Sequence, residues 1–448
     1  MKNSDVKIHE RVEKPLREEW EWLARRTKSK PFLWPGWISA WWDAFGTGEL
    51  RILAAYQDGC LAGVLPLQWS GGSLRSTENE EVPMFGLVTA NDTAVKQLSH
   101  ALFSQGAHRI DLSRLTSDET VISLVRASAH AAGYEVLTSW MHKVPYVAIG
   151  QTTWEAYESG LPRKLRSSLR RRRRRLEERG QLKLQVFDGK ERLDELLEEG
   201  FRVEGSGWKE AQGTSVNSHP AVRRFYTEVA HWAAERGWLR LYFLRLDGRT
   251  LAFDYCFVYD KILHGIKTGY DPAYARFSPG KVLRHLMLAR AFSEGISICD
   301  FGMFEPWKRE WTSAYYELRS LHMFAQEEGE RDAWYYQMYL AAREIGALIP
   351  AGESFVLVDE DSWRIDIGAD RQAIPFLERD GHYWGPPADD ETAIGELERL
   401  RQGGAGYVVF GWPGFWWLEY YGGLHRHLRT NFRCLLENER LVVFELRE

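Results

Sequence analysis

The chain has 448 residues, enough for about three domains at roughly 150 residues each. Its 44% hydrophobic and 27% charged residues exclude a largely disordered chain and a fibrous repeat, and its net charge of −5 argues against a general nucleic-acid partner. No apolar run is long enough for a membrane span, and the N-terminus lacks the apolar core of a signal peptide. We therefore expect a cytoplasmic protein.

Residues 1–150 have the pattern of an α/β domain. Four tryptophans recur at spacings that predict an aromatic face on one short helix, and residues 49–69 predict a strand hairpin that turns at Asp58-Gly59. Residues 107–150 then alternate between strand-like and helix-like runs. The tryptophans are Trp34, Trp37, Trp41 and Trp42.

Residues 151–330 form the second expected domain. It opens with one helix dense in cations over residues 154–180 and continues with a strand, two helices and three sequential antiparallel strands. The turns between those three strands are Asp247-Gly248 and Asp260-Lys261. A loop, a helix that ends at Gly295 and a further strand follow.

Residues 331–448 predict a small C-terminal α/β domain. It contains three strands, a helix that begins after Asp389 and ends at glycine, and a terminal hairpin over residues 433–447. We expect this domain to be an accessory module.

The four cysteines predict neither a zinc site nor a disulfide framework, because they are widely scattered and form no CxxC pair. We expect reduced thiols in the core and no metal. The cysteines are Cys60, Cys256, Cys299 and Cys434.

The segment Ser278-Pro279-Gly280-Lys281 leads from a strand into a helix. The first turn of a helix offers unpaired backbone N–H groups that favour an anion such as a pyrophosphate, and glycine allows close approach to the backbone. Arg276 and Lys281 add positive charge. An ordinary Pro-Gly turn is the structural alternative.

Four ordered motifs resemble a known family: LPRKLRSSLRRRRRRLEERG, EGSGWK, KTGYDPAYARFSPGKVL, and CDFG followed by WKREW. They are similar to acyltransferases of the GNAT superfamily, in the branch of bacterial proteins associated with cellulose and exopolysaccharide genes. The first 150 residues resemble a degenerate copy of the same fold. The resemblance implies an α/β (α+β) class with two tandem GNAT-like domains, whose mixed central sheets are flanked by helices.

The resemblance also implies that acyl-CoA, acetyl-CoA or longer, binds at the second domain as cosubstrate. The strands at residues 263–270 and 296–302 would splay and hold the pantetheine arm between them. The family's loop carries several glycines where this chain has Gly280 alone. The cofactor-binding residues that it implies are Thr268, Arg276, Ser278, Gly280, Lys281 and Val282.

In such a site, strand N–H groups polarise the thioester carbonyl, and a carboxylate removes the proton of the attacking ammonium group. Asp271, Asp300 and Glu204 are the candidate bases, and Tyr270 or Tyr315 could return a proton to the thiolate. Each aspartate also has a purely structural interpretation. Asp271 precedes a proline and Asp300 lies at a strand end, and aspartate commonly forms turns at both kinds of position.

Four further residues are candidates for contact with the acceptor substrate. Trp208 and Lys209 lie beside a Gly-Ser loop. Lys308 lies between Trp307 and Trp311, and Trp311 is the fourth candidate. Solvated or structural roles remain open for each of them.

The cationic helix has ten basic residues within residues 161–180, six of them consecutive at Arg170–Arg175. Its alternatives are a structural or substrate-phosphate role, RNA, and peripheral contact with an anionic membrane. The function expected from the whole sequence is an N-acyltransferase that moves an acyl group from acyl-CoA to an amine, on a sugar or a cell-envelope precursor. An aminoacyl-tRNA-dependent transferase and a non-catalytic glycan-binding or scaffold protein are the alternatives.

Overall fold

A computed structural model describes residues 5–116, 118–150, 152–206, 213–303, 306–325, 334–367, 371–379 and 382–447. The chain divides into two compact units. Unit 1 comprises Met1–Ala107, Asp111–Ala132 and His142–Arg319, and unit 2 comprises the remainder. Two domains that pack closely together form one compact unit, so this division does not test the boundaries expected near residues 150 and 330. Those boundaries remain predictions.

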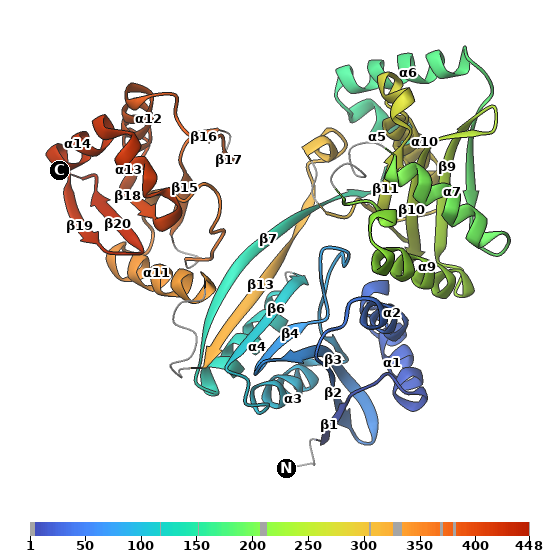
Figure 1. Ribbon diagram of the computed structural model, residues 1–448, viewed down its shortest axis with the longest axis horizontal. Coiled ribbons are helices and arrows are strands. Elements are labelled where there is room, and N and C mark those ends of the chain that lie inside the picture. The colour runs from blue at the N-terminus through green and yellow to red at the C-terminus, as the bar shows by residue number, and fades with distance from the viewer. Residues whose placement is uncertain are drawn as a thin grey trace. The chain divides into compact units, whose positions relative to one another are not determined.

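The first half of unit 1, before α5, is a sheet with helices on both faces (Figure 1). Helices α1 and α2 cover one face, and α3 and α4 cover the other. The strands follow the order β1-β2-β3-β4-β6. The elements are β1 (Asp5–His9), α1 (Lys14–Arg26), η1 (Pro31–Leu33), α2 (Pro35–Phe45), β2 (Glu49–Gln57), β3 (Cys60–Ser70), β4 (Ser73–Ser76), β5 (Val88–Thr89), α3 (Asp92–Phe103), β6 (Arg109–Thr116), α4 (Glu119–Ala131) and β7 (Tyr134–Ala148).

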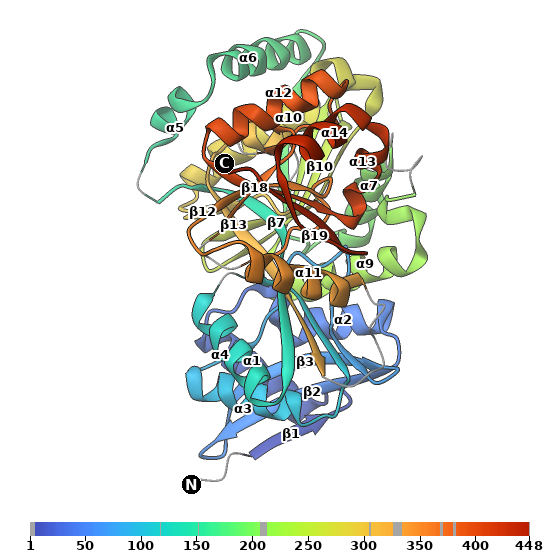
Figure 2. The same cartoon turned by 90° about the vertical axis from the view of Figure 1, so that its left-hand side faces the viewer.

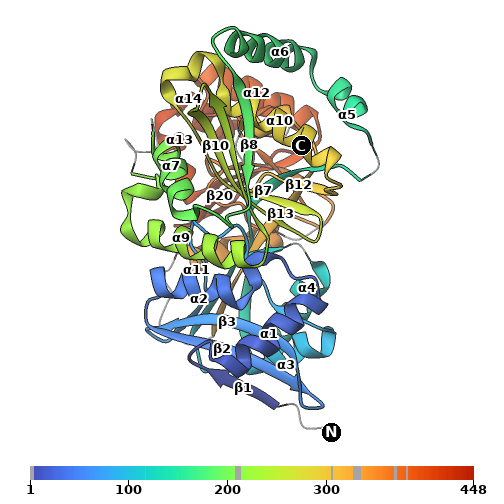
Figure 3. The same cartoon turned by 90° about the vertical axis from the view of Figure 1, so that its right-hand side faces the viewer.

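The second half of unit 1 has the strand order β8-β9-β10-β11-β12, and β12 pairs antiparallel with the end of β7. Figure 3 shows α7 and α9 on one side of this sheet and α10 on the other, with α6 beyond α10. The elements are α5 (Trp154–Gly160), α6 (Arg163–Glu177), β8 (Leu182–Phe187), α7 (Leu193–Gly205), η2 (Val216–Ser218), α9 (Pro220–Glu235), β9 (Leu239–Leu246), β10 (Arg249–Tyr259), β11 (Ile262–Tyr270), η3 (Pro272–Phe277), α10 (Pro279–Ser293), β12 (Ile298–Asp300), η4 (Pro306–Glu310) and β13 (Tyr315–Ala325).

The two halves repeat one order of elements. Each has a strand, two helices, three sequential antiparallel strands, a helix and a further strand, and the sheet order is the same in both. Successive side chains of a strand point to opposite faces of the sheet, as β9 illustrates. Tyr242 and Leu244 pack in the core that includes α10, whereas Phe243 packs against Phe253 on the opposite face. The expected class, a mixed α/β fold with two similar halves, is confirmed.

The cationic helix differs from the prediction, because it is two helices rather than one. Leu161 has extended dihedral angles (φ −64°, ψ 150°) and separates α5 from α6. The cause is Pro162, since a proline disfavours helical geometry in the residue before it. Helix α6 buries Leu165, Leu169 and Leu176 in the core shared with α10.

Aromatic rings join the two halves of unit 1. Trp37 lies 5.0 Å from Phe225 of α9, and Trp34 lies 4.8 Å from Trp238 in an edge-on contact. Charged contacts add to them: Lys267 of β11 lies 2.7 Å from a carboxylate oxygen of Glu81. The aromatic face predicted around α2 is therefore the contact with α9.

Unit 2 is a five-stranded sheet in the order β15-β14-β18-β20-β19. Figures 1 and 2 show α12, α13 and α14 on one face of it, and α11 covers the other. The helix predicted after Asp389 is present, and Asp389 accepts a hydrogen bond from Thr392 N–H at 2.8 Å. The elements are α11 (Trp334–Leu348), β14 (Ser354–Val358), β15 (Gln372–Pro375), β16 (Glu378–Arg379), β17 (His382–Tyr383), α12 (Asp390–Gln402), β18 (Ala405–Gly411), η6 (Trp412–Gly414), α13 (Trp416–Tyr420), α14 (Gly422–Asn431), β19 (Arg433–Glu437) and β20 (Leu441–Glu445).

All four cysteines are free thiols, but only two of them lie in the core as expected. Cys256 and Cys299 are buried, whereas Cys60 is exposed beside the turn between β2 and β3 and Cys434 is half-buried. Among the helices of the described residues, none is long and apolar enough to cross a membrane.

Candidate active site

Strands β11 and β12 pair over only three residues and then part. Their parallel ladder runs from Ile262 and Ile298 to His264 and Asp300, although β11 continues to Tyr270. Two glycines mark the parting. Gly302 has φ +67°, and a Cβ built there would meet Gly265 O at 2.6 Å, so the close approach and the left-handed conformation both require glycine.

The loop after β11 leads directly into the N-terminus of α10. Ser278 has left-handed dihedral angles (φ 44°), and its carbonyl accepts from the N–H groups of Lys281 and Val282. No side chain caps this helix, Pro279 has no N–H, and the N–H of Gly280 has no helical acceptor. A Cβ at Gly280 would meet only the ring of Tyr270, at 3.8 Å, so space is open beside this turn.

The cations expected at this loop have different partners. Lys281 Nζ lies 2.5 Å from Glu310 Oε2, so a carboxylate already offsets its charge. The Arg276 guanidinium lies 4.8 Å over the ring of Phe277. Thr268 lies on β11 opposite Asp254 of β10, and it is half-buried.

Two of the three candidate bases have structural partners. Asp271 accepts from Ala273 N–H at 2.9 Å, as the cap of η3, and its carboxylate lies 2.6 Å from Arg249 Nη2. Glu204 is 1% exposed and accepts from Val216 N–H at 2.9 Å. A carboxylate held by such partners is poorly placed to take a proton from a substrate.

Asp300 is the buried centre of a polar cluster at the point where β11 and β12 part. Its carboxylate accepts from Tyr316 Oη at 2.8 Å and from Gly302 N–H at 2.9 Å, and it lies 3.5 Å from His264 Nδ1. That last distance is long for a hydrogen bond, so the two groups interact as an ion pair when the ring is protonated. Burial alone would raise the pKa of Asp300, but His264, Lys30 and the Gly302 N–H together hold it below its usual range.

The first half of unit 1 contributes Lys30 and Phe32 to this cluster. Lys30 Nζ lies 4.4 Å over the ring of Tyr316, and the ring of Phe32 contacts that of His264 edge-on at 5.3 Å. Burial lowers the pKa of Lys30, and the charge of Asp300 opposes that shift. Burial, followed by the charge of Asp300 and its hydrogen bond, raises the pKa of Tyr316 well above its usual value.

A second buried pair lies beside the cluster. Arg284 of α10 is 3% exposed, and its Nη2 lies 3.3 Å from Asp254 Oδ2, which is equally buried. Within the described residues, the other guanidinium nitrogens of Arg284 and both ring nitrogens of His264 have no hydrogen-bond partner. Unpaired buried polar atoms are costly, so this cluster has hydrogen-bonding capacity that a polar ligand could use.

The remaining predicted residues lie in several places. Tyr270 is 37% exposed and faces Gly280, as expected for a residue near the loop. Tyr315 accepts a hydrogen bond from Lys143 Nζ at 3.2 Å, and strand alternation brings its neighbour Tyr316 to Asp300. Trp208 and Lys209 lie outside the described residues.

Lys308 and Trp311 are buried rather than presented to a substrate. Lys308 Nζ donates to the carbonyls of Phe301 and Met303 at 2.6 and 2.5 Å and so fixes the segment after β12. Trp311 is 2% exposed and packs in the core between the sheet and α10. A ligand could contact Trp311 only if that core opened.

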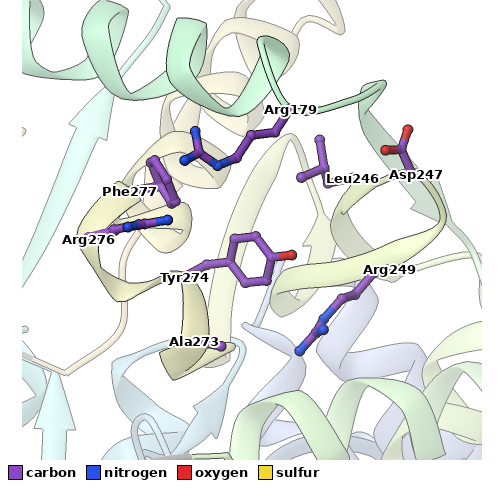
Figure 4. A pocket seen from close by; sticks show the side chains of 8 residues that line it. All are labelled: Arg179, Leu246, Asp247, Arg249, Ala273, Tyr274, Arg276 and Phe277. Carbon is purple, nitrogen blue, oxygen red and sulfur yellow. The ribbon is translucent and has the colours of Figure 1, made fainter.

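A pocket of about 580 Å³ is lined by residues of η3, of the turn between β9 and β10, and by Arg179 just after the C-terminal end of α6. Figure 4 shows Arg179, Arg276 and Phe277 on one side of it, Leu246, Asp247 and Arg249 on the other, and the ring of Tyr274 between them. It is lined by Arg179, Leu246, Asp247, Arg249, Ala273, Tyr274, Arg276 and Phe277. No group of three or more potential metal ligands occurs among the residues that the structure describes.

Sequence reasoning missed Lys30, His264, Arg284 and Tyr316. A weak signal existed for two of them: His264 interrupts an apolar strand, and Arg284 follows two apolar residues at the start of a helix. Lys30 had no such signal, because its place depends on how the two halves contact each other.

Comparison with known proteins gives one family and a set of distant structures. Residues 163–309 match the family model described as "Acetyltransferase (GNAT) domain". No curated protein matches the chain. The matched segment contains α6, the parting strands, the loop and α10.

Three solved structures illustrate the distant similarity. A structure of FemX is 13% identical over 68% of this chain and 95% of its own, with a TM-score of 0.48. The C-terminal domain of a putative lysylphosphatidylglycerol synthetase from Agrobacterium fabrum is 15% identical over 74% of this chain and 96% of its own, with a TM-score of 0.42. A tandem GNAT protein from the clavulanic acid biosynthesis pathway is 10% identical over 73% and 100%, with a TM-score of 0.38.

At these identities and TM-scores the structural matches carry no information on substrate. The family match covers the elements that form the candidate site. Residues 163–309, within the second half of unit 1, are thus similar to the acetyltransferase (GNAT) domain family.

Proposed function

We propose that the protein is an N-acyltransferase that uses acyl-CoA as donor and an amine as acceptor, and that the reaction takes place where β11 and β12 part. The observation that carries the proposal is this parting, directly beside an uncapped helix N-terminus. The family match over the same residues supports it.

The residues at the parting suit a thioester donor. The uncapped N-terminus of α10, with open space at Gly280, suits a pyrophosphate. The unpaired nitrogens of Arg284 suit the polar atoms of a pantetheine arm. Bound there, the thioester supplies the activated acyl group, and the edge of β11 that leaves β12 offers N–H groups to its carbonyl.

Proton removal falls to His264 in this proposal. Asp300 already accepts two hydrogen bonds, whereas the ring nitrogens of His264 have none within the described residues. A proton taken up by His264, directly or through water, is stabilised by the Asp300 carboxylate 3.5 Å away. Asp300 is then a positioning residue, held in place by Tyr316 and Gly302.

The acceptor in this proposal is an amine on a sugar or on a cell-envelope precursor. This choice rests on the motif resemblance to proteins of exopolysaccharide loci. Candidate acceptors can be ranked once the donor is known.

The test is calorimetric titration of the full chain with acetyl-CoA and with longer acyl-CoAs, repeated on Gly280→Glu and on the matched control Gly280→Ala. We expect saturable binding that Gly280→Glu abolishes through repulsion and bulk at the phosphate, while Gly280→Ala binds within a few-fold of wild type. Absence of binding to every CoA ester would overturn the proposal. Transfer from aminoacyl-tRNA and glycan binding without catalysis would then be tested in its place.

A second experiment separates His264 from Asp300. With the donor known, His264→Gln should lower turnover at all pH values and leave the Kd for acyl-CoA nearly unchanged. Asp300→Asn should lower turnover less. Equal turnover in wild type and His264→Gln would remove His264 from the mechanism.

A further inference from the structure

Helix α6 carries a cationic surface that the acyl-transfer site does not use. Seven of its basic side chains have no carboxylate partner in the described part of the chain, while Arg173 and Arg174 pair with Glu177 and Glu178. The seven are Arg163, Lys164, Arg166, Arg170, Arg171, Arg172 and Arg175.

This arrangement destabilises the helix on its own. Arg163 and Lys164 lie at the N-terminus, where the helix dipole disfavours cations, and Arg171 and Arg175 are like charges at i and i+4. A local feature that costs stability without an internal partner is typical of a functional surface. Among the described residues, these cations have no carboxylate partner that would offset this cost.

The surface continues into the pocket at the C-terminal end of α6. The guanidinium of Arg179 lies 4.7 Å over the ring of Phe277, and that of Arg276 lies 4.8 Å from the same ring. Arg249 lies 5.3 Å over Tyr274 (Figure 4). The pocket therefore combines the cations Arg179 and Arg276 with aromatic rings, beside Asp247 and an Arg249 that Asp271 already pairs. Cations and rings are the two elements that bind phosphates and unstacked bases in single-stranded nucleic acids.

We propose that the exposed arginines of α6 and the pocket of Arg179, Arg249, Arg276 and Tyr274 form one docking surface for single-stranded nucleic acid. The helix binds the phosphates, and the pocket receives a base. Helix α6 is about 22 Å long at 1.5 Å per residue, enough for several consecutive phosphates. The proposal does not rest on the proposed acyl transfer.

A membrane fits this surface less well than a nucleic acid. A helix that lies in a membrane interface exposes apolar side chains, but the leucines of α6 are buried against the core. The net charge of −5 does not oppose the proposal, because screening over about 8 Å makes the local cations decisive.

The test is fluorescence anisotropy of the full chain with a labelled 20-nucleotide RNA and with DNA of the same sequence, at several salt concentrations. The variant Arg170→Gln/Arg171→Gln/Arg175→Gln removes three unpaired cations. The matched control Arg173→Gln/Arg174→Gln removes two cations of the same helix that already have carboxylate partners. Thermal unfolding of each variant checks that the fold is retained.

We expect the triple variant to bind at least ten-fold more weakly and to lower the slope of log K against log salt by about 2, since each lost phosphate contact on a single strand removes about 0.7. The control should bind within about three-fold of wild type. Tighter binding of RNA than DNA would identify RNA as the ligand, and equal binding would support the shared phosphate-and-base chemistry.

The pocket is tested separately by Tyr274→Leu, which keeps apolar volume and removes the ring. Base stacking predicts a loss between about five-fold and a hundred-fold. Unchanged affinity would overturn the role of the pocket. Equal loss in the triple variant and its control, or binding to phosphatidylglycerol vesicles with none to either oligonucleotide, would overturn the proposal as a whole.

Discussion

The two halves of unit 1 share one order of elements but differ at the N-termini of two equivalent helices, α3 in the first half and α10 in the second. In the first half, Asn91 caps α3 and accepts from Ala94 N–H at 3.0 Å. In the second half, no side chain caps α10. The N-terminus of this helix is therefore capped by a side chain in the first half and by none in the second.

The central strands differ in the same direction. Strand β3 buries only apolar residues at its centre, whereas the equivalent strand β10 buries Asp254 beside Arg284 of α10. Buried charges contribute little net stability compared with apolar packing. The second half thus buries a charged pair at its central strand, where the first half has apolar residues.

The largest effect on stability should come from breaking that buried pair. Arg284→Met removes the positive charge that faces the buried Asp254 carboxylate, and we expect a loss of about 3 kcal/mol in the free energy of unfolding. The double variant Asp254→Leu/Arg284→Met should recover most of it, because two apolar groups replace the pair. Denaturant titration measures both, and an equally unstable double variant would contradict this account of the pair.

Asp300→Asn should cost about 2 kcal/mol at neutral pH, because it removes a charge that Tyr316, Gly302 and His264 stabilise. The folded-state pKa of Asp300 lies below its unfolded value. Its contribution is therefore complete above the ordinary pKa of aspartate and is lost as the pH falls through the folded-state pKa. The difference between variant and wild type should shrink in that acidic range, and a difference independent of pH would contradict the shift.

Asn91→Ala opens the helix cap of the first half and should cost about 1 kcal/mol. It tests the comparison directly, because it also exposes N–H groups at α3. We expect no gain of acyl-CoA binding by calorimetry, since the centre of β3 is apolar and has no counterpart of the buried Asp254–Arg284 pair. A new binding site in this variant would show that an open helix N-terminus alone is sufficient.

The smallest effect is expected at Asp271. Asp271→Asn keeps the cap of η3 and loses only the exposed pair with Arg249, so stability should change by less than about 1 kcal/mol. Turnover should remain near that of wild type. A large loss of turnover would return Asp271 to the list of candidate bases.

Much of the fold follows from local sequence patterns. The turns at Asp58-Gly59 and Asp247-Gly248 are hairpin turns in the structure, and both residues of each have positive φ angles. Alternation of apolar residues placed the strands, and the Ser278-Pro279-Gly280 segment placed the start of α10. These patterns depend on a few neighbouring residues, so they can be recognised without knowledge of tertiary contacts.

The polar cluster could not be predicted in the same way. Lys30 and Asp300 are 270 positions apart, and they meet only because the two halves pack together. Tyr316 rather than Tyr315 reaches Asp300 because the face of a strand changes with every residue, and the sequence does not determine the register of β13. The position of the loop before α10 could be predicted from the sequence, whereas the side chains that surround it depend on tertiary packing.

The most direct test of the central claim is a crystal structure of the full chain with a non-hydrolysable acyl-CoA analogue. The account predicts the pyrophosphate at the N–H of Gly280 and the pantetheine arm between β11 and β12, beside Arg284 and His264. Density for the analogue at the N-terminus of α3, or only in the pocket at the end of α6, would contradict it.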